Sequence, residues 1–115
     1  MNSYTAVADF KLLLATSEGL YFFSPQQIIR LEAKSNYTSF YFRDHKPIMS
    51  ARVLKDYARQ LEPFGFIRTH RSHLVNKRYI HFVDNAGNIV MQDSFRTGIS
   101  RRKKKKVMNA LKRPG

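Results

Sequence analysis

The chain has 115 residues, of which 43% are hydrophobic and 13% aromatic, so it can form one domain with a single modest core. Its 21 lysines and arginines outnumber 8 aspartates and glutamates, and the net charge of +13 favours a nucleic acid or an anionic membrane as partner. The absence of cysteine excludes disulfides and thiolate metal sites, and the apolar runs are too short to span a bilayer. We therefore expect a soluble protein of the cytoplasm.

The first half of the chain predicts two β-hairpins. Residues 1–10 show no periodicity, so we interpret them as a tail or linker and assign residues 11–113 to the folded domain. Short apolar runs separated by turn residues then follow, a pattern typical of β-rich proteins. The segments Leu12–Ala15 and Leu20–Phe23 flank the turn sequence Ser17-Glu18-Gly19, and Ile28–Ala33 and Tyr37–Phe42 flank Lys34-Ser35-Asn36.

The middle of the chain predicts one helix among further strands. A short strand is expected near Ile48. Apolar side chains then recur at spacings of three and four, which predicts an amphipathic helix over Arg52–Glu62, closed by Pro63 and Gly65. The strands expected after this helix are Phe66–Thr69, Tyr79–Val83 and Asn88–Gln92, with a hairpin turn at Asp84-Asn85-Ala86-Gly87.

The C-terminal segment predicts a second helix whose charge opposes its dipole. It begins at Ser100, a good N-cap residue, and continues with the cations of Arg101–Lys106 before Val107 and Leu111 supply an apolar face. Cations at an exposed helix N-terminus each cost about 0.3–1 kcal/mol. A phosphate bound at this helix start would remove the conflict, and the alternative is a solvated tail or a localisation signal.

The most informative segment is Phe64–Phe82. It holds four lysines and arginines and three histidines, and no acidic residue occurs between Glu62 and Asp84. Apolar residues placed among these cations would anchor the segment to a core and leave a polar edge of one sign of charge. We interpret the segment as a contact surface for a polyanion. A basic surface loop without a partner is the alternative.

With these residues identified, the chain resembles the LytTR-type (LytR/AlgR) DNA-binding domains, which are output modules of many bacterial response regulators. The resemblance runs from about Leu12 to Leu111. It rests on an ordered set of four pieces with matching spacing, which is more specific than any one of them. The pieces are Ile28–Tyr37, Leu54 with the helix around it, Phe66–Asn76 and Gly98–Lys103.

The resemblance implies a mainly β (α+β) fold, an elongated antiparallel β-sandwich of short stacked sheets with two short helices. It also implies that loops read duplex DNA in successive major grooves. The family's base-reading positions fall on Asn36, Arg71 and Arg101, and these residue types can bond bidentately to adenine or guanine. The residues suited to phosphate contacts are Lys34, Ser35, His70, Ser72, His73, Asn76, Lys77, Arg78, Arg102 and Lys103.

The resemblance further implies a sequence-specific transcriptional regulator that needs no cofactor. One such domain covers few base pairs, so we expect two direct or inverted half-sites separated by about one helical turn and a monomer in the absence of DNA. The clustered aspartates of a phosphorylatable receiver are missing. We interpret the chain either as a stand-alone regulator or as the effector domain of a longer one, whose partner would be a receiver domain or a sensor.

A metal-dependent or hydrolytic enzyme is one alternative. His70, His73 and His81 are the candidate zinc ligands, and Ser72 with a neighbouring histidine is the candidate nucleophile. The spacing of the histidines does not match helical zinc motifs, and no glutamate lies nearby as a base or ligand. We therefore expect no catalytic residue and no metal.

An RNA or single-stranded nucleic-acid-binding β-domain is the nearer alternative. Tyr37, Tyr41 and Phe95 could stack on bases, although core packing is the competing use of these rings. A membrane role for the C-terminal cations is weaker, because the apolar face beside them is short.

Overall fold

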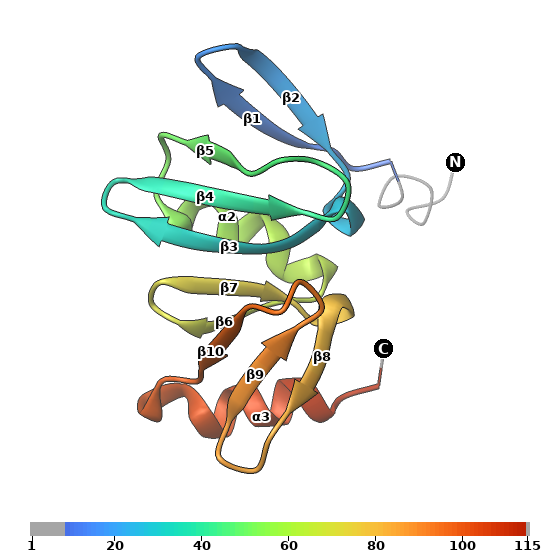
Figure 1. The fold of residues 1–115 in the computed structure, drawn as a ribbon, viewed down its shortest axis with the longest axis vertical. Coiled ribbons are helices and arrows are strands. Elements are labelled where there is room, and N and C mark those ends of the chain that lie inside the picture. Colours follow the sequence, from blue (N-terminus) through green and yellow to red (C-terminus); the bar gives the residue numbers. More distant parts are fainter. Residues whose placement is uncertain (1–8, 115) are drawn as a thin grey trace.

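The computed structural model describes residues 9–114, so most of the tail expected at residues 1–10 lies outside the described part. As predicted, the described chain is mainly β, with three antiparallel sheets and two α-helices (Figure 1). None of the described helices is long and apolar enough to cross a membrane. The elements are β1 Leu12–Thr16, β2 Gly19–Phe23, β3 Ile28–Lys34, β4 Tyr37–Phe42, β5 Ile48–Ser50, α2 Leu54–Leu61, β6 Phe66–His70, β7 His73–Asn76, β8 Ile80–Val83, β9 Asn88–Met91, β10 Arg96–Gly98 and α3 Lys104–Lys112.

The five-stranded sheet is the middle layer of the molecule. Its strand order is β5-β4-β3-β7-β6, and Figure 1 shows the hairpin β1–β2 above it and the sheet of β8, β9 and β10 below it. The central strands β3 and β7 bury side chains on both faces: Leu31 and Leu74 belong to one core, and Ile29 and Val75 to the other. A single layer of strands therefore separates the two cores.

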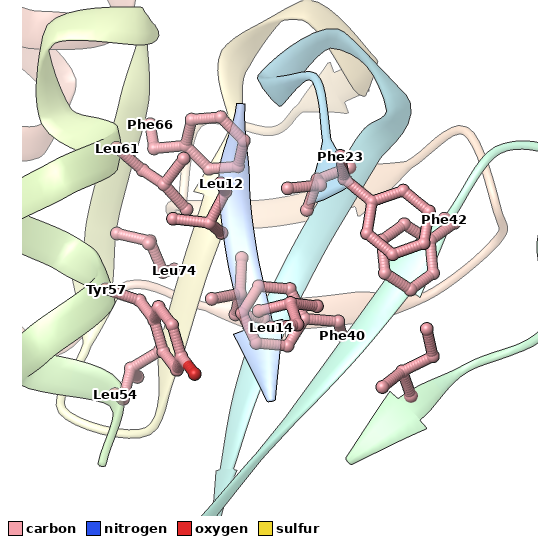
Figure 2. Close-up of a cluster of buried hydrophobic side chains, with 13 residues drawn as sticks. Leu12, Leu14, Phe23, Phe40, Phe42, Leu54, Tyr57, Leu61, Phe66 and Leu74 are labelled. Carbon is pink, nitrogen blue, oxygen red and sulfur yellow. The ribbon is translucent and has the colours of Figure 1, made fainter. Parts of the chain in front are cut away.

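The larger core lies between the hairpin β1–β2, helix α2 and one face of the five-stranded sheet (Figure 2). β1 contributes its alternate residues Leu12 and Leu14, both fully buried. Tyr57 of α2 meets Phe40 edge to face with ring centroids 4.8 Å apart, and its hydroxyl bonds to Ser50 Oγ. Burial of side chains of this size stabilises the fold by about 1.5–3 kcal/mol each.

Helix α2 confirms the amphipathic helix expected over Arg52–Glu62. It begins at Leu54, and its buried residues Leu54, Tyr57 and Leu61 form one face. A 3-10 turn follows, and Gly65 then reverses the chain at φ +88°, in the left-handed region that glycine adopts without strain.

Arg30 joins the five-stranded sheet to the turn between β9 and β10. The residue is 7% exposed, and its guanidinium lies 3.7 Å from the ring centroid of Tyr41 and 3.6 Å from that of Phe95. Its Nε donates to Asp93 Oδ2 at 3.1 Å and its Nη1 to Glu32 Oε1 at 3.4 Å. A buried cation needs such partners, so Arg30 belongs to the folding of the protein.

Two strands differ from the sequence-based expectation. His73–Asn76, for which no strand was predicted, forms β7 beside β3, because Leu74 and Val75 fill the two cores. Arg96–Gly98 adds an unpredicted strand, β10, at the edge of the three-stranded sheet. Both segments are short. β7 is held by β3, which is distant in sequence, whereas β10 pairs with the preceding strand β9.

Candidate nucleic-acid interface

The three loops predicted to contact DNA lie on one side of the molecule, at the left in Figure 1. Two backbone hydrogen bonds fix this arrangement. Ala33 N–H donates to Ser72 O, and Ser100 N–H donates to Thr69 O, each at 2.9 Å. The β6–β7 turn is thus bonded to the chain on both sides. We call the three loops together the loop edge, which comprises residues 34–36, 70–72 and 100–103.

The first loop is a tight hairpin turn between β3 and β4. Lys34 pairs with Tyr37, so only Ser35 and Asn36 reverse the chain. Ser35 has φ +58°, in the left-handed region, and all four residues are exposed. A two-residue turn has little freedom to bend. The strands therefore hold the Asn36 backbone rigidly while its side chain faces solvent.

The second loop carries Arg71 at the tip of β6 and β7. Arg68 Nη2 donates to Arg71 O at 2.5 Å, and Ser72 N–H donates to His70 Nδ1 at 3.1 Å. Thr69 is fully buried, and the strand register shifts between Arg68 and His70. These contacts hold the backbone of the turn, whereas the Arg71 side chain is exposed. The Arg71 guanidinium therefore extends into solvent from a turn whose backbone is held by hydrogen bonds.

The third loop differs from the helix start that the sequence predicts. Ser100 precedes a 3-10 turn, its side chain makes no capping hydrogen bond, and α3 begins only at Lys104. The cations expected in the first turn of an α-helix thus occupy a 3-10 turn. Arg101 and Arg102 are exposed there, and Lys103 is half-buried.

Positive charge accumulates at the loop edge without local compensation. Among residues 9–114, none of its cations forms an ion pair. Burial lowers the pKa of Lys103, and the neighbouring charges of Arg68 and Lys106 lower it further. Glu32 lies on the adjacent strand β3, but Arg30 holds its carboxylate. An uncompensated positive surface of this kind attracts polyanions.

Asn76 lies at the opposite end of β7 from the loop edge. The residue is 3% exposed. Its Nδ2 donates to Ile28 O at 2.9 Å and to Pro25 O at 3.4 Å, and its Oδ1 accepts from Arg78 N–H at 3.1 Å. The amide is thus buried and used inside the fold, and the structure does not bring Asn76 to the loop edge as a phosphate contact.

Lys77 and Arg78 follow Asn76, also away from the loop edge. Lys77 Nζ donates to the carbonyl oxygens of Ala110, at 3.3 Å, and of Arg113, at the C-terminal end of α3. A cation in this position complements the helix dipole. The structure therefore directs the Lys77 ammonium group to the end of α3 and does not bring it to the loop edge. Arg78 is exposed in the 3-10 turn after β7, at the opposite end of that strand from the loop edge.

Of the two histidines predicted to contact phosphate, only His70 lies in the loop edge. His73 pairs with Glu32 of β3, is half-buried, and has its ring centroid 5.3 Å from that of Phe95. Burial lowers the pKa of His73, Glu32 raises it, and the charges of His70 and Arg30 lower it. A ring that resists protonation carries less positive charge toward phosphate, and the His73 ring packs against Phe95.

The sequence did not reveal the two arginines that support the loop edge. Arg68 bonds to the backbone of the second loop, and Arg30 neutralises the carboxylate beside it. For Arg30 a signal existed, because it stands between Ile29 and Leu31 in an apolar strand, where an unpaired cation would be unstable. For Arg68 nothing distinguished it from the exposed cations nearby.

Comparison with known proteins identifies the family. The family model of the LytTr DNA-binding domain matches residues 18–112. Among solved structures, the fold is similar to the LytTr DNA-binding domain of a protein described as a methyl-accepting/DNA response regulator from Bacillus cereus. That match has 22% identity and a TM-score of 0.76, and it covers 91% of this chain and 99% of the other. Comparison with curated protein sequences gives no match. The chain belongs to the LytTR family of DNA-binding domains.

Proposed function

We propose that the chain binds duplex DNA in a sequence-specific manner through the loop edge and acts as a transcriptional regulator or its output domain. The observation that carries this proposal is the pair of backbone hydrogen bonds, Ala33 to Ser72 and Ser100 to Thr69, which align three exposed basic loops. Family membership supports the same conclusion. The loops would enter the major groove, where each base pair presents a distinct pattern of donors and acceptors.

In this proposal Asn36, Arg71 and Arg101 read bases. All three are exposed, and one lies in each loop of the edge. An arginine can donate two hydrogen bonds to guanine O6 and N7, and an asparagine can bond to adenine N6 and N7. The supported turn of Arg71 favours it as the strongest reader, because little conformational freedom of the backbone is lost when the groove is occupied.

Phosphate contacts hold the register of the loops on the duplex. The candidates that remain at the loop edge are Lys34, Ser35, His70, Ser72, Arg102 and Lys103. About six neutralised phosphates would give a slope near −5 in a plot of log affinity against log salt. Such a salt dependence distinguishes a polyanion partner from a neutral one.

We expect two half-sites about one helical turn apart on the DNA, each bound by one copy of the chain. In the absence of DNA, the chain is expected to be a monomer at micromolar concentration. If the chain is part of a longer regulator, a receiver domain or a sensor would control it. The similar Bacillus cereus protein is described as a response regulator, which supports this context.

RNA binding remains the alternative function. It depended on three aromatic rings, but Tyr41 and Phe95 pack on the Arg30 guanidinium, which leaves Tyr37 as the one exposed ring of the three. A single exposed ring offers little stacking surface to single strands.

The decisive experiment is selection of bound fragments from a random duplex pool, followed by competition at equal salt. We expect an enriched motif. We also expect unlabelled selected duplex to displace the bound labelled duplex far better than its single strands or the matching RNA do. Enrichment without any motif, or equal competition by RNA, would overturn the proposal.

A further inference from the structure

The outer face of hairpin β1–β2 is apolar and exposed. The strand register pairs Leu13 with Phe22 and Ala15 with Leu20, so these four side chains lie together on the face turned away from the larger core. Leu13 is 49% exposed, Leu20 62% and Phe22 61%. We call this patch of Leu13, Ala15, Leu20 and Phe22 the hairpin face.

The hairpin face differs from the rest of the surface in charge as well as in polarity. Residues 11–23 contain one cation, Lys11, and one anion, Glu18, whereas the whole chain carries +13. β1 and β2 form a two-stranded sheet of their own, so no further strand of residues 9–114 pairs with their outer edges. A neutral apolar patch on a basic protein is not a surface for DNA, and it is typical of a protein contact.

We propose that the hairpin face binds the hairpin face of a second copy of this chain. At this surface two strongly basic molecules can come into contact without placing like charges opposite each other. Lys11 precedes β1 and Glu18 lies in the turn, at opposite ends of the hairpin. If the two hairpins pack antiparallel about a two-fold axis, Lys11 of each copy faces Glu18 of the other, so the patch is self-complementary in charge.

The contact is weak by its size. Four side chains cover far less than the roughly 800 Å² per partner of a standard interface, so the chain is a monomer at micromolar concentration. Two copies held on neighbouring half-sites would meet at an effective concentration of about a millimolar, at which a weak contact is populated. The hairpin face would thus couple two DNA-bound copies while leaving the free protein monomeric.

Sedimentation equilibrium without DNA tests the contact directly. At up to about 500 μM protein in about 0.5 M salt, where long-range repulsion is screened, we expect the wild type to form a dimer. Leu20→Lys should weaken dimerisation at least about tenfold, because it places a charge in the apolar contact. Phe82→Lys is the matched control: Phe82 is 56% exposed on β8, outside the hairpin, and its change should leave dimerisation unaltered.

A mixing experiment tests the antiparallel arrangement. Leu20 lies near the turn and Phe22 nearer the open end, so each should face the other across the two-fold axis. An equimolar mixture of Leu20→Lys and Phe22→Glu should therefore associate more tightly than either variant alone. A wild type that stays monomeric at the highest concentration, or a Phe82→Lys variant as impaired as Leu20→Lys, would overturn the proposal. Neither result depends on DNA binding, so the proposed function would stand or fall separately.

Discussion

The two ends of strand β7 have similar residues and use them differently. At one end, the β6–β7 turn exposes Arg71, which forms no ion pair with the described residues. At the other end, Asn76 bonds to Ile28 and Pro25, and Lys77 bonds to carbonyl oxygens that end α3. Both ends belong to one basic segment with no acidic residue. The availability of a polar side chain is thus decided by nearby backbone oxygens, which a count of charges does not reveal.

The comparison separates polar residues that serve folding from those free to bind a ligand. Arg30, Asn76 and Lys77 belong to the first group, because buried donors need acceptors inside the protein. Arg71, Arg101 and Lys105 belong to the second, since all three are exposed. Substitutions in the first group should change stability, and substitutions in the second should change DNA affinity.

The largest change in the free energy of unfolding is expected for Arg30→Met. The change leaves two carboxylates that are each 24% exposed without their cation and removes the stacking between Tyr41 and Phe95. We expect a loss of about 3 kcal/mol in the free energy of unfolding, measured by urea denaturation. A variant within about 0.5 kcal/mol of the wild type would show that Arg30 does not join the two sheets energetically.

Asn76→Ala should cost about 2 kcal/mol, because it leaves the carbonyl oxygens of Ile28 and Pro25 without the amide donor. The matched control is Arg78→Ala, two residues further on and exposed, which should be neutral in the same urea titration. DNA affinity per folded molecule should be unchanged in Asn76→Ala. A stable Asn76→Ala variant with lost DNA binding would restore the phosphate contact that the sequence suggested.

The elements were predictable where local pattern decides them, and the errors come from long-range partners. Hairpin β1–β2 consists of two apolar runs around a turn sequence, and helix α2 carries clear helical periodicity, so both were expected from sequence. β7 has only four residues among cations, and its identity as a strand depends on pairing with β3, where Val75 faces Arg30.

The same reason explains which site residues could be predicted. The three loops were predicted from the resemblance to a family, in which the corresponding pieces follow one another in the same order along the chain. The commitment of Lys77 to Ala110, 33 residues away, is invisible to local pattern. The sequence indicated that Arg30 needs a partner but not which one, because Glu32 of β3 and Asp93 of the turn between β9 and β10 meet at one buried cation.

Arg71→Ala tests the exposed end of β7, where the side chain is free to bind DNA. If Arg71 reads guanine, its loss should cost about 1–3 kcal/mol on the selected duplex and much less on random DNA, measured by titration at fixed salt. Arg78→Ala removes the same charge from the opposite end of β7 and should leave discrimination intact. Circular dichroism would confirm that both variants are folded. Equal weakening of both duplexes by Arg71→Ala would exclude Arg71 as a base reader.

Lys105→Ala should have a smaller and less selective effect. Lys105 is exposed in the first turn of α3, beyond the loop edge, and is expected to interact with the phosphate field alone. Its loss should weaken binding to all duplexes about equally and reduce the salt slope by about one. A selective loss on the chosen sequence would place Lys105 among the base readers instead.

The smallest effect is a dependence of stability on pH through His73. Burial lowers the pKa of His73 in the folded state, so the folded protein resists a proton that the unfolded chain accepts near pH ~6.5. Neutral His73 therefore contributes fully to the free energy of unfolding above that pH, and this contribution is lost as the pH falls below it. Urea midpoints at about pH 7.5 and 5.5 should therefore show a decline in the wild type that His73→Gln reduces. His81→Gln, which changes an exposed histidine on β8, should keep the full decline. A His73→Gln decline equal to that of the wild type would show that His73 is protonated as readily in the folded protein as in the unfolded chain, and would return it to the candidates for phosphate contact.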